Sequence, residues 1–196
     1  MLIQDENIDN ARFAACLPLI LRQEQKVFGD WSNPKNFDND RHDPGGKTMN
    51  GIIQREYDTY RKAKGETPRD VRKITQDEGT EIYYRGYWIP YCDWIPPGLD
   101  LSFFNASVNA GTHEAIKVLQ GALEIPVDGE WGPQTEGAMK NLGNTNSEQI
   151  SAVIARFAER MEAFYRSLNT FQYFGANWIR RTVTIQAQSR NMIQTA

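Results

Sequence analysis

The segment LPLILRQEQKVF, residues 17–28, ends a helical pattern and places a carboxylate among apolar side chains. The pattern repeats every three or four residues and consists of Phe13, Leu17, Ile20, Glu24 and Val27. This spacing puts its members on one face of an α-helix. We therefore expect a core-facing helix over residues 8–25, kinked at Pro18. Glu24 then lies on the buried face, where a charged group loses hydration.

Two interpretations of Glu24 follow from this pattern. If the helix reaches residue 24, burial disfavours the charged form of the carboxyl group, which suits a general acid. If the helix ends at Arg22, Glu24 faces solvent, as acids at helix ends commonly do. One reaction that uses such a general acid is cleavage of a glycosidic bond. It also needs a second polar group, which attacks the sugar or holds a water. The loop that follows offers Asp38, Asp40, His42, Asp43 and Thr48.

Helical periodicity continues through most of the chain and predicts a mainly α protein. Further helices are expected over residues 52–65, 74–88, 99–111, 113–123, 147–168 and 177–189. Thr75 and Glu78 fit a capping box, Ser147 fits a cap, and Gly65 fits a C-terminal stop. EIPVDGEW, residues 124–131, fits either a short hairpin or a tight loop. The predicted fold is a multi-helix globule with at most a short hairpin.

Composition and charge exclude several classes of protein. The chain has 196 residues, of which 40% are hydrophobic and 24% charged, so it is neither disordered nor fibrous. A net charge of −3 without a long basic run argues against nucleic-acid binding. No run approaches the roughly 18 apolar residues of a membrane span. Acids precede the first apolar segment, so we expect no signal peptide.

Cysteine and histidine are too sparse to predict a metal or redox centre. Cys16 and Cys92 could form a disulfide, but two buried thiols are the expected arrangement. His42 and His113 lie far apart and belong to no zinc-binding motif. We therefore expect neither a metal nor another cofactor. No linker divides the chain, so residues 1–100 and 101–196 are predicted to be two regions of one compact unit.

Two further segments have both a structural and a functional interpretation. DPGGKTMNG, residues 43–51, forms a sharp turn in which Thr48 and Asn50 fit caps for the next helix. It lacks the glycine spacing and the preceding strand of a phosphate-binding loop. The aromatic segment IYYRGYWIPYCDWIP, residues 82–96, is expected in the core, although such rings also suit stacking on sugars.

Together these segments resemble the glycoside hydrolase family 108 muramidases, which occur among phage endolysins and secretion-associated lysozymes. DPGGKTMNGIIQREYDTYRKAKG, residues 43–65, is similar to the family's Asp-Pro-Gly-Gly-x-Thr-x-x-Gly signature and the helix after it. IYYRGYWIPYC, residues 82–92, is similar to its Ile-Tyr-x-x-x-Tyr-Trp segment. FFNASVNAGTHEAIKVLQGALEIPVDGEWGPQT, residues 103–135, resembles its predicted peptidoglycan-binding region.

The resemblance implies a lysozyme-like fold and assigns roles to particular residues. Glu24 stands where the family has its catalytic acid, and Asp43 and Thr48 resemble the partners of that acid. Two glycines normally follow the acid, whereas Gln25 and Lys26 follow it in this chain. The expected substrate-binding residues lie in or beside the matching motifs and are Asn50, Tyr87, Trp88 and Asn109.

The activity implied by the resemblance is hydrolysis of the β-1,4 bond between N-acetylmuramic acid and N-acetylglucosamine in peptidoglycan. Glu24 would protonate the bridging oxygen, while Asp43 and Thr48 would hold a water on the opposite face of the sugar. This arrangement inverts the anomeric centre. A separation of about 5–5.5 Å between the two carboxyl groups would instead favour retention.

The expected biological role is that of a phage endolysin. The protein would remain a monomer in the host cytoplasm until a holin releases it to the peptidoglycan of the periplasm. Three alternatives stay open at this point. They are a peptidoglycan-binding protein without catalysis, a bacterial muramidase that assists a secretion system, and a lytic transglycosylase, which can work with a single Glu.

Overall fold

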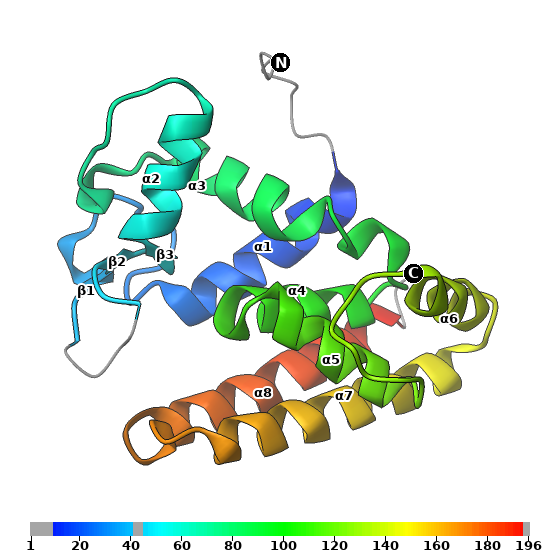
Figure 1. Cartoon of the computed structure of the whole chain (residues 1–196). Coiled ribbons are helices and arrows are strands. Elements are labelled where there is room, and N and C mark those ends of the chain that lie inside the picture. The colour runs from blue at the N-terminus through cyan, green and yellow to red at the C-terminus, as the bar shows by residue number, and fades with distance from the viewer. Residues whose placement is uncertain (1–9, 41–44, 194–196) are drawn as a thin grey trace. The chain divides into compact units, whose positions relative to one another are not determined.

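The computed structural model describes residues 10–40 and 45–193, and there the chain is mainly α-helical (Figure 1). The chain divides into two compact units, Met1–Gly86 and Tyr87–Ala196. The predicted fold class is confirmed, because β-structure in the described residues is confined to one small three-stranded sheet. The functional division at residue 100 stays a prediction.

The first helix, α1, spans Ala11–Glu24 and has the expected amphipathic character. It continues through Pro18, and its buried side chains are Phe13, Cys16, Leu17, Ile20 and Leu21. Glu24 is the last helical residue, so the interpretation that ends the helix at Arg22 is wrong. Val27 lies beyond the helix, and the apolar stripe therefore stops one member earlier than the sequence suggested.

Three two-residue strands follow α1 in the first unit. They are β1 (Phe37–Asp38), β2 (Thr48–Met49) and β3 (Ile52–Ile53), and they pair antiparallel in that order. The connection between β2 and β3 is Asn50-Gly51, with φ angles of +52° and +80°. Positive φ at both central residues is the geometry of the tight turn that best fits the twist of a hairpin, and Asn-Gly is its preferred sequence.

This hairpin replaces the helix start that was predicted at residue 52. The second helix, α2, spans Gln54–Ala63, and its N-cap residue Ile53 makes no side-chain capping bond. The prediction that Thr48 and Asn50 cap this helix is therefore wrong, because Thr48 belongs to β2 and Asn50 to the turn. The C-terminal stop is confirmed, since Gly65 adopts φ +74° after the end of α2.

The third helix, α3, spans Gln76–Tyr83 and starts with the predicted capping box. The Thr75 hydroxyl accepts a hydrogen bond from the N–H of Glu78 at 3.3 Å, and the Glu78 carboxylate accepts one from the N–H of Thr75 at 2.9 Å. Short 3₁₀ turns at Pro34–Asn36 and Val71–Lys73 complete the unit. A π-helical turn, Tyr84–Trp88, carries the chain onward.

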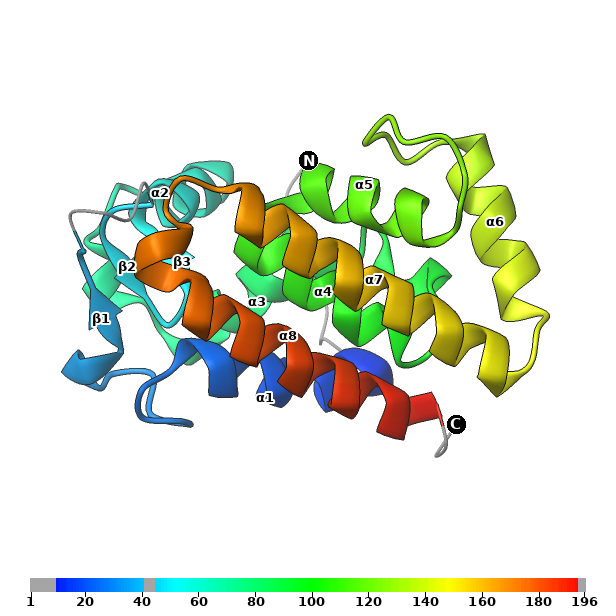
Figure 2. The ribbon, with the colours of Figure 1, turned by 90° about the horizontal axis from the view of Figure 1, so that it is seen from below.

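The second unit is built from helices. After a 3₁₀ turn at Cys92–Trp94 come α4 (Leu99–Ala110), α5 (Thr112–Ala122), α6 (Pro133–Gly143), α7 (Ser147–Ser167) and α8 (Phe171–Ile193). Helices α7 and α8 form a long antiparallel pair, and α4 lies against both (Figure 2). The predicted apolar face of α7 is buried at Val153, Ile154, Phe157 and Met161. The cap of α7 is Asn146, one residue before the predicted Ser147.

Residues 124–131 form a loop without strands, which resolves the choice between hairpin and loop. The buried side chain of Gln120 shapes this loop. Its Nε2 donates to the Asp128 carboxylate at 2.7 Å and to the backbone oxygen of Glu130 at 3.0 Å. Its Oε1 accepts from the N–H groups of Asp128 and Gly129 at 3.0 and 2.9 Å. This glutamine therefore has a structural role.

Cys16 and Cys92 are both fully buried, in agreement with the expected burial of the two thiols. Among the described residues, none of the helices has the length and apolar character needed to cross a membrane. The close packing of the first unit is clearest at Gly79 of α3, which lies against the buried ring of Trp31. A Cβ atom at residue 79 would overlap that ring.

Gly79→Ala should therefore destabilise the protein by about 1–3 kcal/mol, because the added methyl group forces Trp31 out of its place. The measurement is urea-induced unfolding followed by circular dichroism. Gly86→Ala is the matched control, since its Cβ would meet only Glu56 at an ordinary 3.8 Å. Equal stability of the two variants would contradict the proposed overlap.

Candidate active site

Glu24 ends α1 with its side chain packed against the turn of the β2–β3 hairpin. A Cβ atom added to Gly51 would lie 2.7 Å from Cγ and 2.9 Å from the carboxyl carbon of Glu24. It would also lie 2.5 Å from the hydroxyl oxygen of Tyr83. Only glycine leaves room for this approach, and only glycine adopts φ +80° without strain. The carboxyl group of Glu24 is therefore placed beside the turn and the Tyr83 side chain.

Asn50, the other residue of the turn, is fully buried and makes four hydrogen bonds. Its Oδ1 accepts from Nε2 of Gln25 at 3.1 Å, and its Nδ2 donates to the backbone oxygen of Trp31 at 2.9 Å. Its N–H donates to the backbone oxygen of Asn36 at 3.2 Å. Its backbone oxygen accepts from the Tyr83 hydroxyl at 2.8 Å. The turn is thus tied to three separate parts of the first unit.

The loop after α1 is folded back on itself by Asn36. The Asn36 side chain accepts from the N–H of Val27 at 2.7 Å and donates to the backbone oxygens of Val27 and Asp30 at 3.0 and 2.8 Å. Lys26 points into solvent and pairs with the exposed Asp38 at 3.2 Å. The two residues that follow Glu24 thus differ, because Gln25 is buried while Lys26 is exposed.

The other predicted catalytic residues are placed as follows. Thr48 lies in β2, in the same hairpin as Gly51, and its hydroxyl donates to the backbone oxygen of Gly46 at 3.0 Å. Asp43 lies outside the described residues, as does the loop candidate His42. Glu24 and Asn50 are brought together at one turn. Asn50 uses its side-chain amide inside the protein, and direct substrate contact by this residue stays a prediction.

The remaining predicted substrate-binding residues belong to the second unit. Trp88 is fully buried, its indole N–H donates to Asp93 at 2.8 Å, and its ring contacts Phe104 edge-on with centroids 5.4 Å apart. Tyr87 is half-buried. Asn109 donates from Nδ2 to the Tyr165 hydroxyl at 3.0 Å. Their role toward a substrate stays a prediction.

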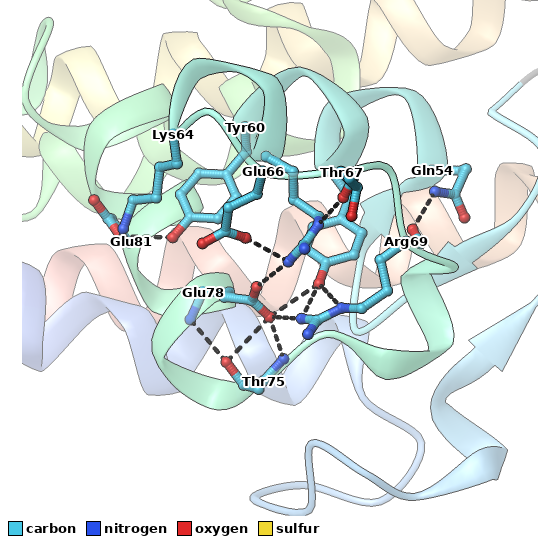
Figure 3. Close-up of polar contacts among 11 residues, drawn as sticks. Gln54, Tyr60, Lys64, Glu66, Thr67, Arg69, Thr75, Glu78 and Glu81 are labelled. Carbon is cyan, nitrogen blue, oxygen red and sulfur yellow. Dashed lines mark hydrogen bonds and ion pairs between the residues drawn. The ribbon is translucent and has the colours of Figure 1, made fainter. Parts of the chain in front are cut away.

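A polar cluster joins α2 to α3 and so fixes the helix that carries Tyr83 (Figure 3). Glu78 is its centre: it accepts from the Tyr57 hydroxyl and from Arg61, both at 2.9 Å, and is paired with Arg69. A second carboxylate, that of Glu81, accepts from the Tyr60 hydroxyl at 2.6 Å and pairs with Lys64 and Arg85. The carboxylates and the cationic side chains of this cluster are partly buried and form ion pairs with one another.

Hydrogen bonds decide the protonation states in this cluster. Burial acts to raise the pKa of Glu78, but hydrogen bonds from the Thr75 N–H and the Tyr57 hydroxyl, together with the Arg69 charge, lower it overall. The pKa of Glu81 is lowered for the same kind of reason, against its own burial. Burial and the Glu81 carboxylate raise the pKa of Tyr60 to about 12, so this phenol stays a hydrogen-bond donor.

Sequence reasoning missed three residues of this site, namely Gln25, Gly51 and Tyr83. The signal for Gly51 was available, because Asn-Gly between apolar residues is a strong indication of a hairpin turn. Gln25 and Tyr83 carry no such signal, since their roles depend on contacts over 25 and 33 residues of sequence.

Residues 35–111 match the Glycosyl hydrolase 108 family. The matched segment runs from just before β1 to just after α4. The predicted family and enzyme class, a glycoside hydrolase, are therefore confirmed. The family 108 segment contains Thr48, Asn50, Tyr87, Trp88 and Asn109, and it begins after Glu24.

Comparison with curated protein sequences gives no match. Among solved structures the chain is similar to SagA from Brucella abortus, with a TM-score of 0.75 and 23% identity. The similarity covers 93% of this chain and 95% of that one. At this level of identity the likeness shows a shared fold.

Within the family 108 segment, Gly51→Ala should destabilise the protein by more than Gly65→Ala. Both residues have positive φ, which costs alanine about 1–2 kcal/mol. At residue 51 the methyl group also overlaps Glu24 and Tyr83, whereas nothing lies within 4 Å at residue 65. Urea unfolding of both variants measures the difference, and equal losses would contradict the close packing of Glu24 on the turn.

The polar cluster predicts a pH dependence of stability. The pKa of Glu78 is lower in the folded protein than its ordinary value of 4.5. The stability that ionised Glu78 contributes is therefore complete above pH 4.5 and is lost as the pH falls through the pKa of the folded state. The free energy of unfolding should thus decrease on acidification, and Glu78→Gln should reduce this decrease. Asp77→Asn, an exposed carboxylate in the same helical turn, is the control. An unchanged acid slope in Glu78→Gln would rule out this assignment.

Proposed function

We propose that this protein hydrolyses the β-1,4 bond between N-acetylmuramic acid and N-acetylglucosamine in peptidoglycan, with Glu24 as the general acid. The observation that carries the proposal is the placement of Glu24 at the end of α1 against Gly51, next to a segment that belongs to family 108. The turn and Tyr83 restrict the movement of the side chain, and a fixed position is what proton transfer to a substrate oxygen requires.

The proposed reaction is a single displacement. Protonated Glu24 gives its proton to the bridging oxygen while a water attacks the anomeric carbon from the opposite face. Asp43 removes a proton from that water, and the Thr48 hydroxyl helps to hold it. The support for Thr48 is its position in the hairpin that also contains Gly51.

The proposed biological role is lysis of a bacterial host by a phage. The resemblance to family 108 proteins among phage endolysins supports this role. The protein would wait as a monomer in the host cytoplasm and would reach the peptidoglycan through the pore of a holin. Lysis of a Gram-negative host only when the protein is co-expressed with a holin would support this route, and lysis by the protein alone would argue against it.

The central test compares wild type with Glu24→Gln on purified Gram-negative sacculi. Loss of the general acid should lower the rate of release of reducing ends by about 100-fold or more. Mass spectrometry identifies the products, and Glu159→Gln, an exposed carboxylate on α7, is the matched control. Equal activity of wild type and Glu24→Gln would refute the assignment of Glu24.

The same digest separates the alternative functions. Anhydro products would indicate a lytic transglycosylase. Binding of wild type to sacculi without release of any product would indicate a binding protein that lacks catalysis. The anomer that forms first, followed by nuclear magnetic resonance, distinguishes inversion from retention.

A further inference from the structure

We infer that Gln25 is a positioning residue for Glu24: its side chain clamps the end of α1 to the Asn50-Gly51 turn and thereby holds the acid in place. This inference rests on the proposed function, because it concerns the proposed catalytic acid. It assigns a role to the side chain that directly follows the acid, where family 108 muramidases normally have glycine.

The clamp consists of two hydrogen bonds from one side chain. Nε2 of Gln25 donates to Oδ1 of Asn50 at 3.1 Å, and Oε1 accepts from the N–H of Gly29 at 2.8 Å. The side chain is almost completely buried, with 6% of its surface exposed. Both polar ends are therefore satisfied in a place where water cannot replace them.

The backbone directs the Gln25 side chain inward. Gln25 is the C-cap of α1, and its N–H still donates to the backbone oxygen of Leu21 at 2.7 Å. Its own φ and ψ of −96° and +124° are extended. The helix therefore ends at this residue, and successive side chains in an extended segment point to opposite sides. Gln25 enters the interior, whereas Lys26 faces solvent.

The bond to Asn50 bears directly on Glu24. Asn50 is the neighbour of Gly51, and Gly51 is the residue on which the Glu24 side chain rests. Loss of the Gln25 donor would leave the buried Oδ1 of Asn50 without this partner, while Nδ2 of the same amide would still donate to Trp31. The turn would then lose its bond to the residue that ends α1, and the carboxyl group of Glu24 could move from its position. Small displacements of a catalytic group lower the rate of the chemical step.

The test is the steady-state kinetics of Gln25→Met on solubilised glycan strands from sacculi. Methionine keeps the length and volume of the side chain but cannot donate to Asn50. We expect kcat to fall by about tenfold or more with KM within about twofold, because the acid is misplaced while binding is retained. Gln23→Met, a half-buried residue two positions earlier, is the matched control and should keep wild-type kcat. Assays run below the thermal midpoint of the least stable variant.

A double-mutant cycle separates positioning from a general loss of stability. Asn50→Gly removes the acceptor and still permits the positive φ of this position. If Gln25 acts through Asn50, the double variant should lose no more kcat than Asn50→Gly alone. Should Gln25→Met fail to fold, Asn50→Gly removes this bond together with the one from Nδ2 to Trp31, and a fall in kcat at least as large is expected.

Each outcome decides the inference. Wild-type kcat in Gln25→Met, a rise in KM with kcat unchanged, or additive losses in the cycle would each overturn it while leaving the proposed function intact. An inactive wild type would instead refute the proposed function, and the positioning role would fall with it. A selective and non-additive loss of kcat supports the assignment.

Discussion

The candidate site depends on the hydrogen bonds made by the buried residue Asn50. A tight hairpin turn of two residues with positive φ is unremarkable by itself, but this one is tied by side-chain and backbone bonds to Gln25, Trp31, Asn36 and Tyr83. These partners come from the end of α1, the loop after it and the end of α3. Because a buried amide that loses a partner is costly, all of these segments are held to one geometry.

The polar cluster between α2 and α3 extends this constraint outward. Its two carboxylates, Glu78 and Glu81, are paired with arginine and lysine and fix α3 along its length. Tyr83 is the last residue of α3, and its hydroxyl reaches the turn. This cluster can thus influence how firmly the turn, and with it Glu24, is held.

The sequence predicted the helices well because burial of a helical face leaves a periodic pattern that can be read locally. The stripe of α1, the capping box of α3 and the break at Gly111 are all visible in this way. The hairpin was missed because each strand has only two residues, too few for a period to appear, and Asn50 was interpreted as a helix cap. The stripe left the role of Glu24 open, and the family resemblance assigned it as the acid. Its contact with Gly51 depends on tertiary packing that no local pattern encodes.

The two residues that follow Glu24, where the family resemblance implies a pair of glycines, lie in opposite environments. An extended segment sends one side chain inward and the next outward. The inward residue, Gln25, must satisfy both of its polar ends, and it does so with Asn50 and Gly29. The outward residue, Lys26, pairs with Asp38 while both remain more than half exposed, and such pairs contribute little to stability. The side chain of Gln25 therefore ties the end of α1 to the turn, whereas that of Lys26 adds a solvated charge to the surface.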